Sequence, residues 1–522
     1  MCTLILFNAD VITMDPGCPR AELVAVDREI ITAVGGNELL GSLKEPGTRV
    51  IDCRGSTLIP GFVDAHCHLR AYAEALVSPR LSPRDGIRSI ADIGRAIAKA
   101  CDTMPAGTWI RAKGYSEFHL AEKRHPDRHD LDAAAPRHPV ILTHRSGHAH
   151  ALNSFALRRL KISAATEEPP GGMIDRDLKT GAPTGIFYGM GNYLAGKMPR
   201  MDDALLLEGA KMAEKNLLSF GVTSIHDVSP SNNLSRLEQY KSLKEQGVFR
   251  PRVAMALGWE EFLRQREHPD LFRSDKTGVR VRGVKIVVNE ATGSLHPGID
   301  ELNARLAAIH EAGCQAIIHA IEPAAIEAAA EAVAFAVNRR PRPDHRHRIE
   351  HCSVCPPPLR QKLAGLGVTV VTQPAFIYYS GDRYIETVPA DQIDHLYPTG
   401  SLMSQGVAVA FSSDFPISDP CPLAGIGAAV TRMTEGGRKL LPEHAISVAD
   451  ALRAYTLGAA AAMFEEKEKG SIAPGKFADM VMLGENPYNV NPVAIRDIEA
   501  LMTILAGAVA WRKPTANQGP LF

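Results

Sequence analysis

The sequence predicts an α/β protein, a (β/α)8 barrel with a small β-sandwich assembled from both ends of the chain. Three observations point to this architecture. Apolar runs rich in Val, Ile and Ala alternate with helix-like segments through the middle of the chain, as expected for parallel strands that helices cover on the outside. Most of these runs start roughly 20 to 40 residues apart, the length of one strand–helix unit. Short strands with turns occupy the two ends instead.

Eight apolar runs are the expected barrel strands. They cover residues 62–68, 222–227, 252–258, 281–289, 315–319, 347–351, 368–372 and 407–412. The gap between the first two runs is much longer than one unit, so an insertion is expected at about residues 69–201. It contains a helix-like segment at 85–102, strand candidates at 109–115 and 139–145, and a hairpin pattern at 171–187. We expect the insertion to form a lid or side wall over the barrel mouth.

The two ends of the chain are expected to fold together. Residues 1–58 and 467–522 both contain short strands, and each set is too small to bury a core alone. One β-sandwich made from both segments is the simplest arrangement. The barrel with its insertion would then occupy residues 59–466.

Composition and charge narrow the class of protein. The 522 residues are 45% hydrophobic and 22% charged, as in folded globular chains. Lys and Arg number 58 against 59 Asp and Glu, so no strong field attracts nucleic acid or an anionic membrane, and neither partner is expected. Nine dispersed cysteines and the lack of a signal-like start predict a cytoplasmic protein. The sequence is compatible with a homo-oligomer.

Polar side chains stand at the ends of the expected strands. His66 and His68 end the first strand and project together, because residues i and i+2 share one side. Lys285, His319, His351 and Asp414 lie on or just after strands four, five, six and eight. Since barrel active sites form at the carboxyl ends of strands, the set predicts a metal site. Taken singly, each residue also fits a structural role, such as a hydrogen-bonded core histidine or a helix cap.

These motifs resemble a known enzyme family. GFVDAHCH, GVKIVV, AIIHA, RIEHC and SSDFP, in this order, are similar to the amidohydrolase superfamily, specifically amidohydrolase family 3, which includes N-substituted formamide deformylases. The resemblance covers nearly the whole chain, including GHAHALNSFAL in the insertion and KGSIAPGKFADMVML near the end. It implies a metal-dependent hydrolase that cleaves a carbon–nitrogen bond in a small molecule. The substrate would be an amide, an N-acyl or N-formyl amine, or a cyclic amide.

The resemblance also implies roles for single residues. His66 and His68 would bind a first divalent ion, and His319 and His351 a second. Asp414 would contact the first ion and act as base toward the bridging water. Lys285 would be carbamylated by CO2 and bridge both ions, because an ammonium group would be repelled by them. Zn²⁺ is the favoured metal for these nitrogen and oxygen ligands, and it would activate a hydroxide for attack.

Two further histidines are candidates for substrate binding. His148 lies in the insertion motif, where a substrate contact and a hydrogen bond that orders its loop fit equally well. His226 ends the second strand, at the edge that would line the pocket. Cys67 should point to the opposite face of its strand from His66 and His68, so it is not expected to bind metal.

Two rival functions stay open at this point. A mononuclear deaminase of a heterocycle would use the same barrel, with one metal ion and an unmodified Lys285. A non-catalytic barrel that binds a partner or ligand is the other rival. The intact ligand set argues against it, because buried metal ligands are costly to leave unpaired.

Overall fold

The computed structural model describes residues 2–272, 278–290 and 293–514. These residues pack into two compact units. One unit consists of Met1–His68, Glu214–Val288 and Ile299–Phe522, and the other of Leu69–Ala213 and Asn289–Gly298.

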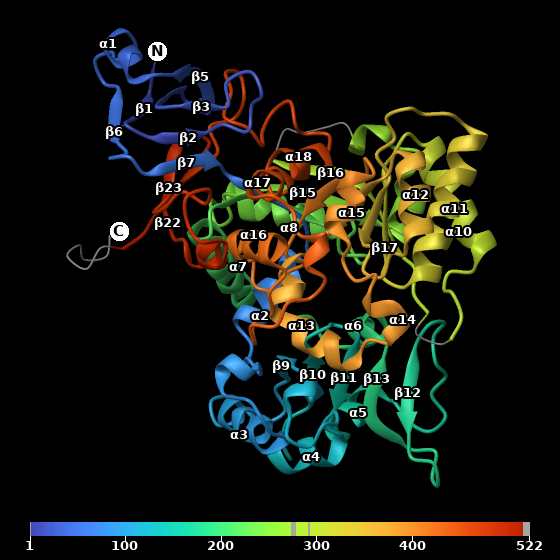
Figure 1. Cartoon of the computed structure of the whole chain (residues 1–522). Coiled ribbons are helices and arrows are strands. Elements are labelled where there is room, and N and C mark those ends of the chain that lie inside the picture. The colour runs from blue at the N-terminus through green and yellow to red at the C-terminus, as the bar shows by residue number, and fades with distance from the viewer. Residues whose placement is uncertain (1, 273–277, 291–292, 515–522) are drawn as a thin grey trace. The chain divides into compact units, whose positions relative to one another are not determined.

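An eight-stranded parallel sheet forms the centre of the first unit (Figure 1). Its order is β20-β19-β18-β17-β16-β15-β14-β8. The strands are β8 (Phe62–Cys67), β14 (Val222–Asp227), β15 (Arg252–Gly258), β16 (Val279–Val287), β17 (Ala316–Ala320), β18 (Arg348–His351), β19 (Thr369–Thr372) and β20 (Ala408–Phe411). Each predicted strand is present, with its ends within two residues of the prediction. The predicted fold class is confirmed.

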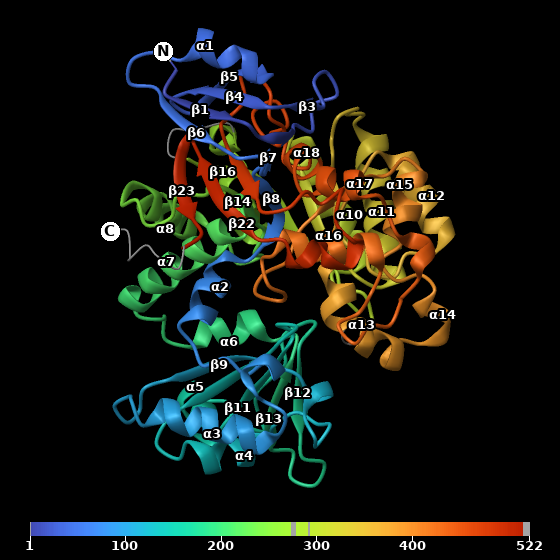
Figure 2. The same ribbon diagram turned by 60° about the vertical axis from the view of Figure 1, so that its left-hand side comes forward.

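The two outer strands of this sheet approach each other and nearly close the barrel. The main-chain N–H of Asp414, just after β20, donates to the carbonyl oxygen of His66 in β8 at 2.9 Å. Helices surround the strands (Figure 2). They are α7 (Asp203–Ser219), α8 (Leu234–Glu245), α9 (Trp259–Gln265), α10 (Ile299–Glu311), α11 (Pro323–Arg339), α12 (Pro357–Leu366), α13 (Ala375–Thr387), α14 (Ala390–Ile393), α15 (Thr399–Ser404), α16 (Pro422–Thr431), α17 (Val448–Ala454) and α18 (Leu457–Ala461). Because helices cover the outer face and side chains fill the interior, the strands are buried on both sides.

Two further sheets combine both ends of the chain in a β-sandwich. The four-stranded sheet has the order β5-β4-β1-β6 and the six-stranded sheet β23-β22-β21-β7-β2-β3. Their strands are β1 (Leu4–Phe7), β2 (Asp10–Ile12), β3 (Arg20–Ala21), β4 (Leu23–Asp27), β5 (Ile30–Gly35), β6 (Arg49–Asp52), β7 (Thr57–Pro60), β21 (Met480–Leu483), β22 (Ala500–Leu505) and β23 (Ala508–Arg512), and α1 (Leu40–Leu43) follows β5. Antiparallel pairing of β21 with β7 joins the two ends, and one apolar core contains residues from both. The boundaries at residues 58 and 467 stay a prediction.

An ion pair attaches the sandwich to the barrel. Arg252, at the start of β15, donates from Nε and Nη2 to the Asp479 carboxylate at 2.6 and 3.2 Å. The guanidinium also lies over the ring of Phe477, 3.6 Å from its centroid. This contact lies at the amino end of β15, the end of the barrel opposite the edge where active sites form.

The second unit has its own sheet and its own apolar cores. The sheet has the order β12-β13-β11-β10-β9, with β9 and β10 parallel. Its elements are α2 (Leu69–Leu76), α3 (Ile90–Cys101), β9 (Ile110–Tyr115), α4 (Arg128–Ala134), β10 (Val140–His144), β11 (Ala149–Leu152), α5 (Ser154–Leu160), β12 (Met173–Arg176), β13 (Pro183–Tyr188) and α6 (Gly191–Lys197). The unit extends beyond the insertion expected at 69–201, because residues 202–213, 289–290 and 293–298 also pack into it.

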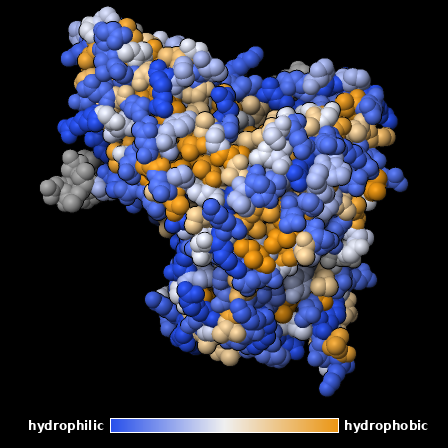
Figure 3. Space-filling view, viewed as in Figure 1, coloured by the Kyte–Doolittle hydropathy of each residue, from blue (hydrophilic) through white to orange (hydrophobic). Residues whose placement is uncertain are grey.

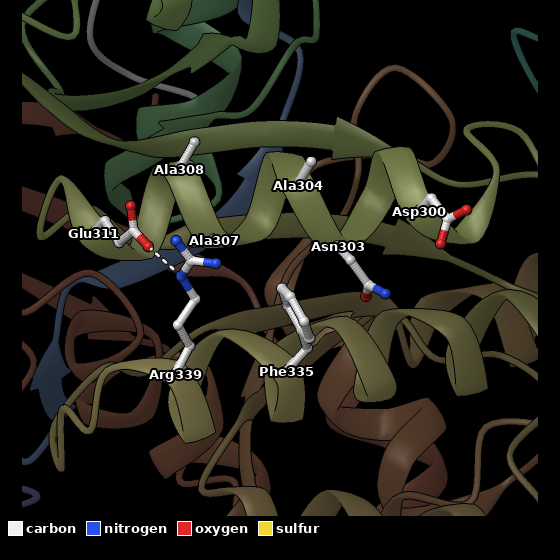
Figure 4. A pocket seen from close by; sticks show the side chains of 8 residues that line it. All are labelled: Asp300, Asn303, Ala304, Ala307, Ala308, Glu311, Phe335 and Arg339. Carbon is white, nitrogen blue, oxygen red and sulfur yellow. Dashed lines mark hydrogen bonds and ion pairs between the residues drawn. The ribbon is translucent and has the colours of Figure 1, made fainter.

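A groove lies in the outer helical layer of the barrel. About 410 Å³ in volume, it lies between α10 and α11, with Asn303 and Phe335 on opposite walls and the Glu311–Arg339 ion pair at one end (Figure 4). None of the predicted site residues lines it. The face in Figure 3 is mainly hydrophilic, with apolar patches between. Within the described ranges, every helix is too short or too polar to span a lipid bilayer.

Three buried histidines link elements near the amino end of β18. His347 Nδ1 accepts from the Ala316 N–H at 2.9 Å, so its Nε2 carries the proton and donates to His310 Nδ1 at 2.8 Å. His310 Nε2 then donates to the Arg340 carbonyl at 2.7 Å. The ring of His345 stacks on that of His347, and its Nδ1 accepts from the His347 N–H. These hydrogen bonds are made by neutral imidazoles.

Because of this histidine cluster, we expect a fall in pH to destabilise the first unit. Burial lowers the pKa of all three histidines from 6.5, whereas the unfolded chain takes up the protons near pH 6.5. The free energy of unfolding should fall as the pH drops through that value, by at most about 1.4 kcal/mol per pH unit and histidine. The free energy of unfolding, measured with urea at several pH values, should depend less steeply on pH in His347→Asn than in the parent. The Oδ1 of the asparagine still accepts from the Ala316 N–H. Equal slopes for variant and parent would contradict the assignment.

Candidate active site

The carboxyl edge of the barrel brings together the six side chains that the sequence singled out. They are His66 in β8, His68 after it, Lys285 in β16, His319 in β17, His351 at the end of β18 and Asp414 after β20. Four of them are buried, while His68 and His319 are partly exposed. The edge is therefore polar and mostly closed to solvent.

Distances within this cluster are short. The ring centroids of His66 and His68 lie 5.3 Å apart, those of His66 and His351 4.9 Å, and those of His319 and His351 4.5 Å. Asp414 Oδ1 lies 3.2 Å from His68 Nε2 and 3.5 Å from His66 Nε2. One ligand atom each from His66, His351 and Asp414 lies within 4.8 Å of the other two, a spacing on which a metal ion could be held.

Local backbone geometry directs two of these side chains. His351 and Asp414 have φ values of 69° and 58°, in the left-handed region that non-glycine residues rarely adopt. Hydrogen bonds hold the turn at Asp414 in place, because Asp64 accepts from the Ser413 N–H at 3.1 Å and from its hydroxyl at 2.5 Å. Such strained conformations persist where the surroundings fix them, and they are frequent in active sites.

Protein partners on Nδ1 fix the ring orientation of two histidines. Gln373 Nε2 donates to the Ser412 hydroxyl at 2.9 Å, so its Oε1 faces His351 and accepts from His351 Nδ1 at 2.8 Å. His66 Nδ1 contacts the carboxylate of Glu350, which can only accept. In both rings Nδ1 therefore carries the proton and Nε2 presents its lone pair.

His68 has a neutral partner at the same position. Its Nδ1 lies 2.8 Å from the Ser229 hydroxyl. The main-chain N–H of Ser229 in turn donates to Asp227 at 2.9 Å. This leaves His68 Nε2 directed at Asp414, as the 3.2 Å distance above records.

Electrostatics favour lone pairs over protons in the cluster. Burial and the nearby Lys285 hold the pKa of His66 well below its usual range. Burial raises the pKa of Asp414, but the nearby His66, His68 and His351 rings outweigh it, so the pKa of that carboxyl lies below its ordinary value. Burial also lowers the pKa of Lys285 to about 8. Burial lowers the pKa of His351 as well, so the imidazoles of His66 and His351 are neutral, Asp414 is anionic, and a neutral amine is accessible near physiological pH.

The residues present fit a divalent metal ion. Neutral imidazole nitrogens and a carboxylate are the donors that zinc and related metals take in proteins. Lys285 Nζ is buried, with 2% exposure of the residue, and has no hydrogen-bond partner among the described residues. A buried polar atom without a partner is rare in proteins and calls for a ligand, ion or modification.

The two histidines predicted to bind substrate occupy different settings. His226 is fully buried, with Nδ1 against Arg348 at 2.8 Å and Nε2 against the Arg282 carbonyl at 3.0 Å. Neither ring nitrogen is left for a substrate, so the expectation of a substrate contact does not fit this geometry. His148 is an exposed residue in the turn between β10 and β11 of the second unit. Cys67 donates from Sγ to the His226 carbonyl at 3.3 Å and is directed away from the cluster.

Sequence reasoning missed the side chains that support the histidines. Glu350 and Gln373 lie on or next to barrel strands, and Ser229 follows β14. A signal was available for one of them. Arg348 and Glu350 are two charges on either side of Ile349 in a short strand, a pattern that a buried barrel strand tolerates only when the charges are paired.

Comparison with known proteins identifies the family of the chain. Residues 49–510 match the model of the amidohydrolase family. The chain is 29% identical to the N-substituted formamide deformylase of Arthrobacter pascens, over 98% of this chain and 99% of that protein. It is 28% identical to the putative amidohydrolase YtcJ of Bacillus subtilis (strain 168), over 95% of this chain and 96% of that one.

A solved structure shares the fold. An uncharacterized metal-dependent hydrolase from Pyrococcus horikoshii superposes with a TM-score of 0.76 at 23% identity, covering 94% of this chain and 99% of that one. The parallel barrel and the family match together define this protein as a barrel hydrolase. The chain belongs to the amidohydrolase family, and the family assignment made from its motifs is confirmed.

Proposed function

We propose that this protein is a metal-dependent amidohydrolase that cleaves a carbon–nitrogen bond in an amide, an N-acyl or N-formyl amine, or a cyclic amide. The observation that carries the proposal is the convergence of oriented imidazoles with Asp414 and a Lys285 Nζ that has no hydrogen-bond partner among the described residues. The formamide deformylase name of the Arthrobacter relative supports an N-formyl amine as the first substrate class to test.

The proposed ligands divide between two divalent ions, with Zn²⁺ favoured. His66, His68 and Asp414 would hold the first ion, and His319 and His351 the second. Lys285 would bridge them as a carbamate. When bound, such ions lower the pKa of water toward neutrality and polarise a substrate carbonyl.

Lys285 is suited to carbamate formation. With a pKa of about 8, a useful fraction of the amine is neutral and nucleophilic at physiological pH. The Nζ lone pair attacks CO2, a new carbon–nitrogen bond forms, and one proton leaves. The product is an anion with two oxygens where an ammonium group stood, and burial protects it from solvent.

Asp414 is the proposed base. Its carboxylate faces His66 and His68 Nε2, so it would stand beside the attacking water. Asp414 would accept the proton as the water oxygen bonds to the carbonyl carbon. It would return that proton to the leaving nitrogen as the carbon–nitrogen bond breaks.

Metal analysis and a substrate screen test the proposal together. We expect about two equivalents of a divalent metal per chain and hydrolysis of at least one class among N-substituted formamides, N-acyl amines and cyclic amides, measured as amine release. Dialysis against a chelator should abolish turnover, and Zn²⁺ should restore it. One equivalent with heterocycle deamination would identify the deaminase alternative. Full activity after exhaustive chelation would refute metal dependence.

Asp414→Asn should abolish turnover and leave metal content nearly intact. The amide keeps the size of the side chain but cannot accept the proton, so kcat should fall by about 10² to 10⁴. Asp479→Asn is the matched control, because Asp479 is also a buried carboxylate but pairs with Arg252 at the opposite end of the barrel. Its kcat should stay near that of the parent. Normal turnover by Asp414→Asn would end the base assignment.

Lys285 should carry CO2 in the metal-loaded protein. Reconstitution with Zn²⁺ and ¹³C-bicarbonate should give a carbamate signal in the ¹³C NMR spectrum, and Lys285→Arg should lack it, because guanidinium remains protonated. Removal of bicarbonate should also reduce uptake of the second ion. Two bound ions beside an unmodified amine would contradict the carbamate.

We also propose a cytoplasmic location and a small-molecule substrate for this protein. All nine cysteines lie in the described ranges without forming a disulfide, which supports a reducing compartment such as the cytoplasm. A small-molecule substrate follows from the family. We propose no nucleic-acid or membrane partner, in keeping with the formal net charge of −1.

A further inference from the structure

We propose that Glu350, Arg348 and His226 form a buried relay that positions His66 and sets the affinity of the metal ion bound by that ring. The inference rests on the proposed metal centre. All four side chains belong to the first unit and are at most 1% exposed. The relay acts on the metal through His66 alone, so its members are positioning residues.

The first link joins Glu350 to His66. The carboxylate contacts His66 Nδ1, and neither side chain is accessible to solvent. Because an ionised carboxylate only accepts, the proton sits on Nδ1 and the lone pair of Nε2 is directed toward Asp414. A carboxylate behind a ligating imidazole fixes the tautomer and raises the basicity of the ring.

The second link holds the Glu350 carboxylate in place. Arg348 lies two residues earlier in β18, and its Nε and Nη2 donate to the two carboxylate oxygens at 2.8 and 2.9 Å. Nη2 also donates to the Ala65 carbonyl at 2.7 Å, next to His66 in the chain. The guanidinium thus compensates the buried carboxylate and holds both of its oxygens, one of which contacts His66.

The third link fixes Arg348. Its Nη1 lies 2.8 Å from His226 Nδ1, and because guanidinium only donates, that nitrogen must accept. The proton of His226 is therefore on Nε2, where it donates to the Arg282 carbonyl at 3.0 Å. Every donor along the relay has a defined direction, from a main-chain carbonyl of β16 to the Nε2 lone pair of His66.

Fold stability alone does not account for this arrangement. A buried ion pair rarely stabilises a protein more than apolar residues of the same size, so the barrel interior does not need these charges to pack. The relay ends at one nitrogen that faces the candidate site. His68 and His351 have neutral partners in Ser229 and Gln373. Among these three rings, only His66 is backed by a carboxylate.

The test measures affinity for Zn²⁺ itself, by competition with a chromophoric chelator. Glu350→Ala should raise the Kd of the more tightly bound Zn²⁺ ion by up to about 100-fold. Glu350→Gln, which keeps a neutral acceptor, should raise this Kd by about tenfold. Glu465→Gln is the matched control. Glu465 is a comparably buried carboxylate paired with Arg280, Arg282 and Lys469. None of these partners is a proposed ligand, and Glu465 pairs with the side chain of Arg282, whereas His226 donates to its main-chain carbonyl. Its Kd should stay within about twofold of the parent.

A second readout separates positioning from general damage. Circular dichroism of the metal-free proteins checks folding, and the rise in Tm on adding Zn²⁺ should shrink in both Glu350 variants but not in Glu465→Gln. If Glu350→Ala fails to fold, Glu350→Gln carries the test. Parental affinity in Glu350→Gln, or an equal loss in Glu465→Gln, would overturn the relay. If the parent protein does not bind Zn²⁺, both the proposed metal centre and the relay are overturned.

Discussion

Burial of charge is the constraint that organises the carboxyl edge of the barrel. A carboxylate or ammonium group removed from water without compensation costs several kcal/mol. Arg348 and Glu350 meet this constraint within the protein, through two hydrogen bonds to one carboxylate. Lys285 Nζ has no such partner among the described residues. Arg348 and Glu350 therefore compensate each other within the barrel, whereas Lys285 Nζ needs a partner from outside the chain.

The barrel was predictable from the sequence because the signal for each strand is local. A parallel strand covered on both sides is a continuous apolar run, and its polar end marks the edge where chemistry takes place. The strands that carry His66, Lys285 and His319 follow this pattern within two residues. The order of the motifs along the chain then led to the family, which the match over residues 49–510 confirms.

What the sequence could not predict depends on which strands become neighbours. His226 and His319 look alike in sequence, since each stands near the end of an apolar run. Only the fold shows that Arg348 reaches His226 from across the barrel and occupies Nδ1. The same limit explains residues 289–290 and 293–298. They follow a barrel strand closely, yet they pack with residues 69–213 through contacts that no local pattern encodes.

The two sides of the proposed centre are built by different means. On the side of His66, the chain supplies a carboxylate, since Arg348 pairs with Glu350 and Glu350 contacts the imidazole. Gln373 gives His351 orientation without charge. The anionic ligand between the two sides would come from CO2 through Lys285. The carboxylate of Glu350 thus contacts His66 whenever the chain is folded. The carbamate on Lys285 would instead form only by reaction of a buried, neutral amine with CO2.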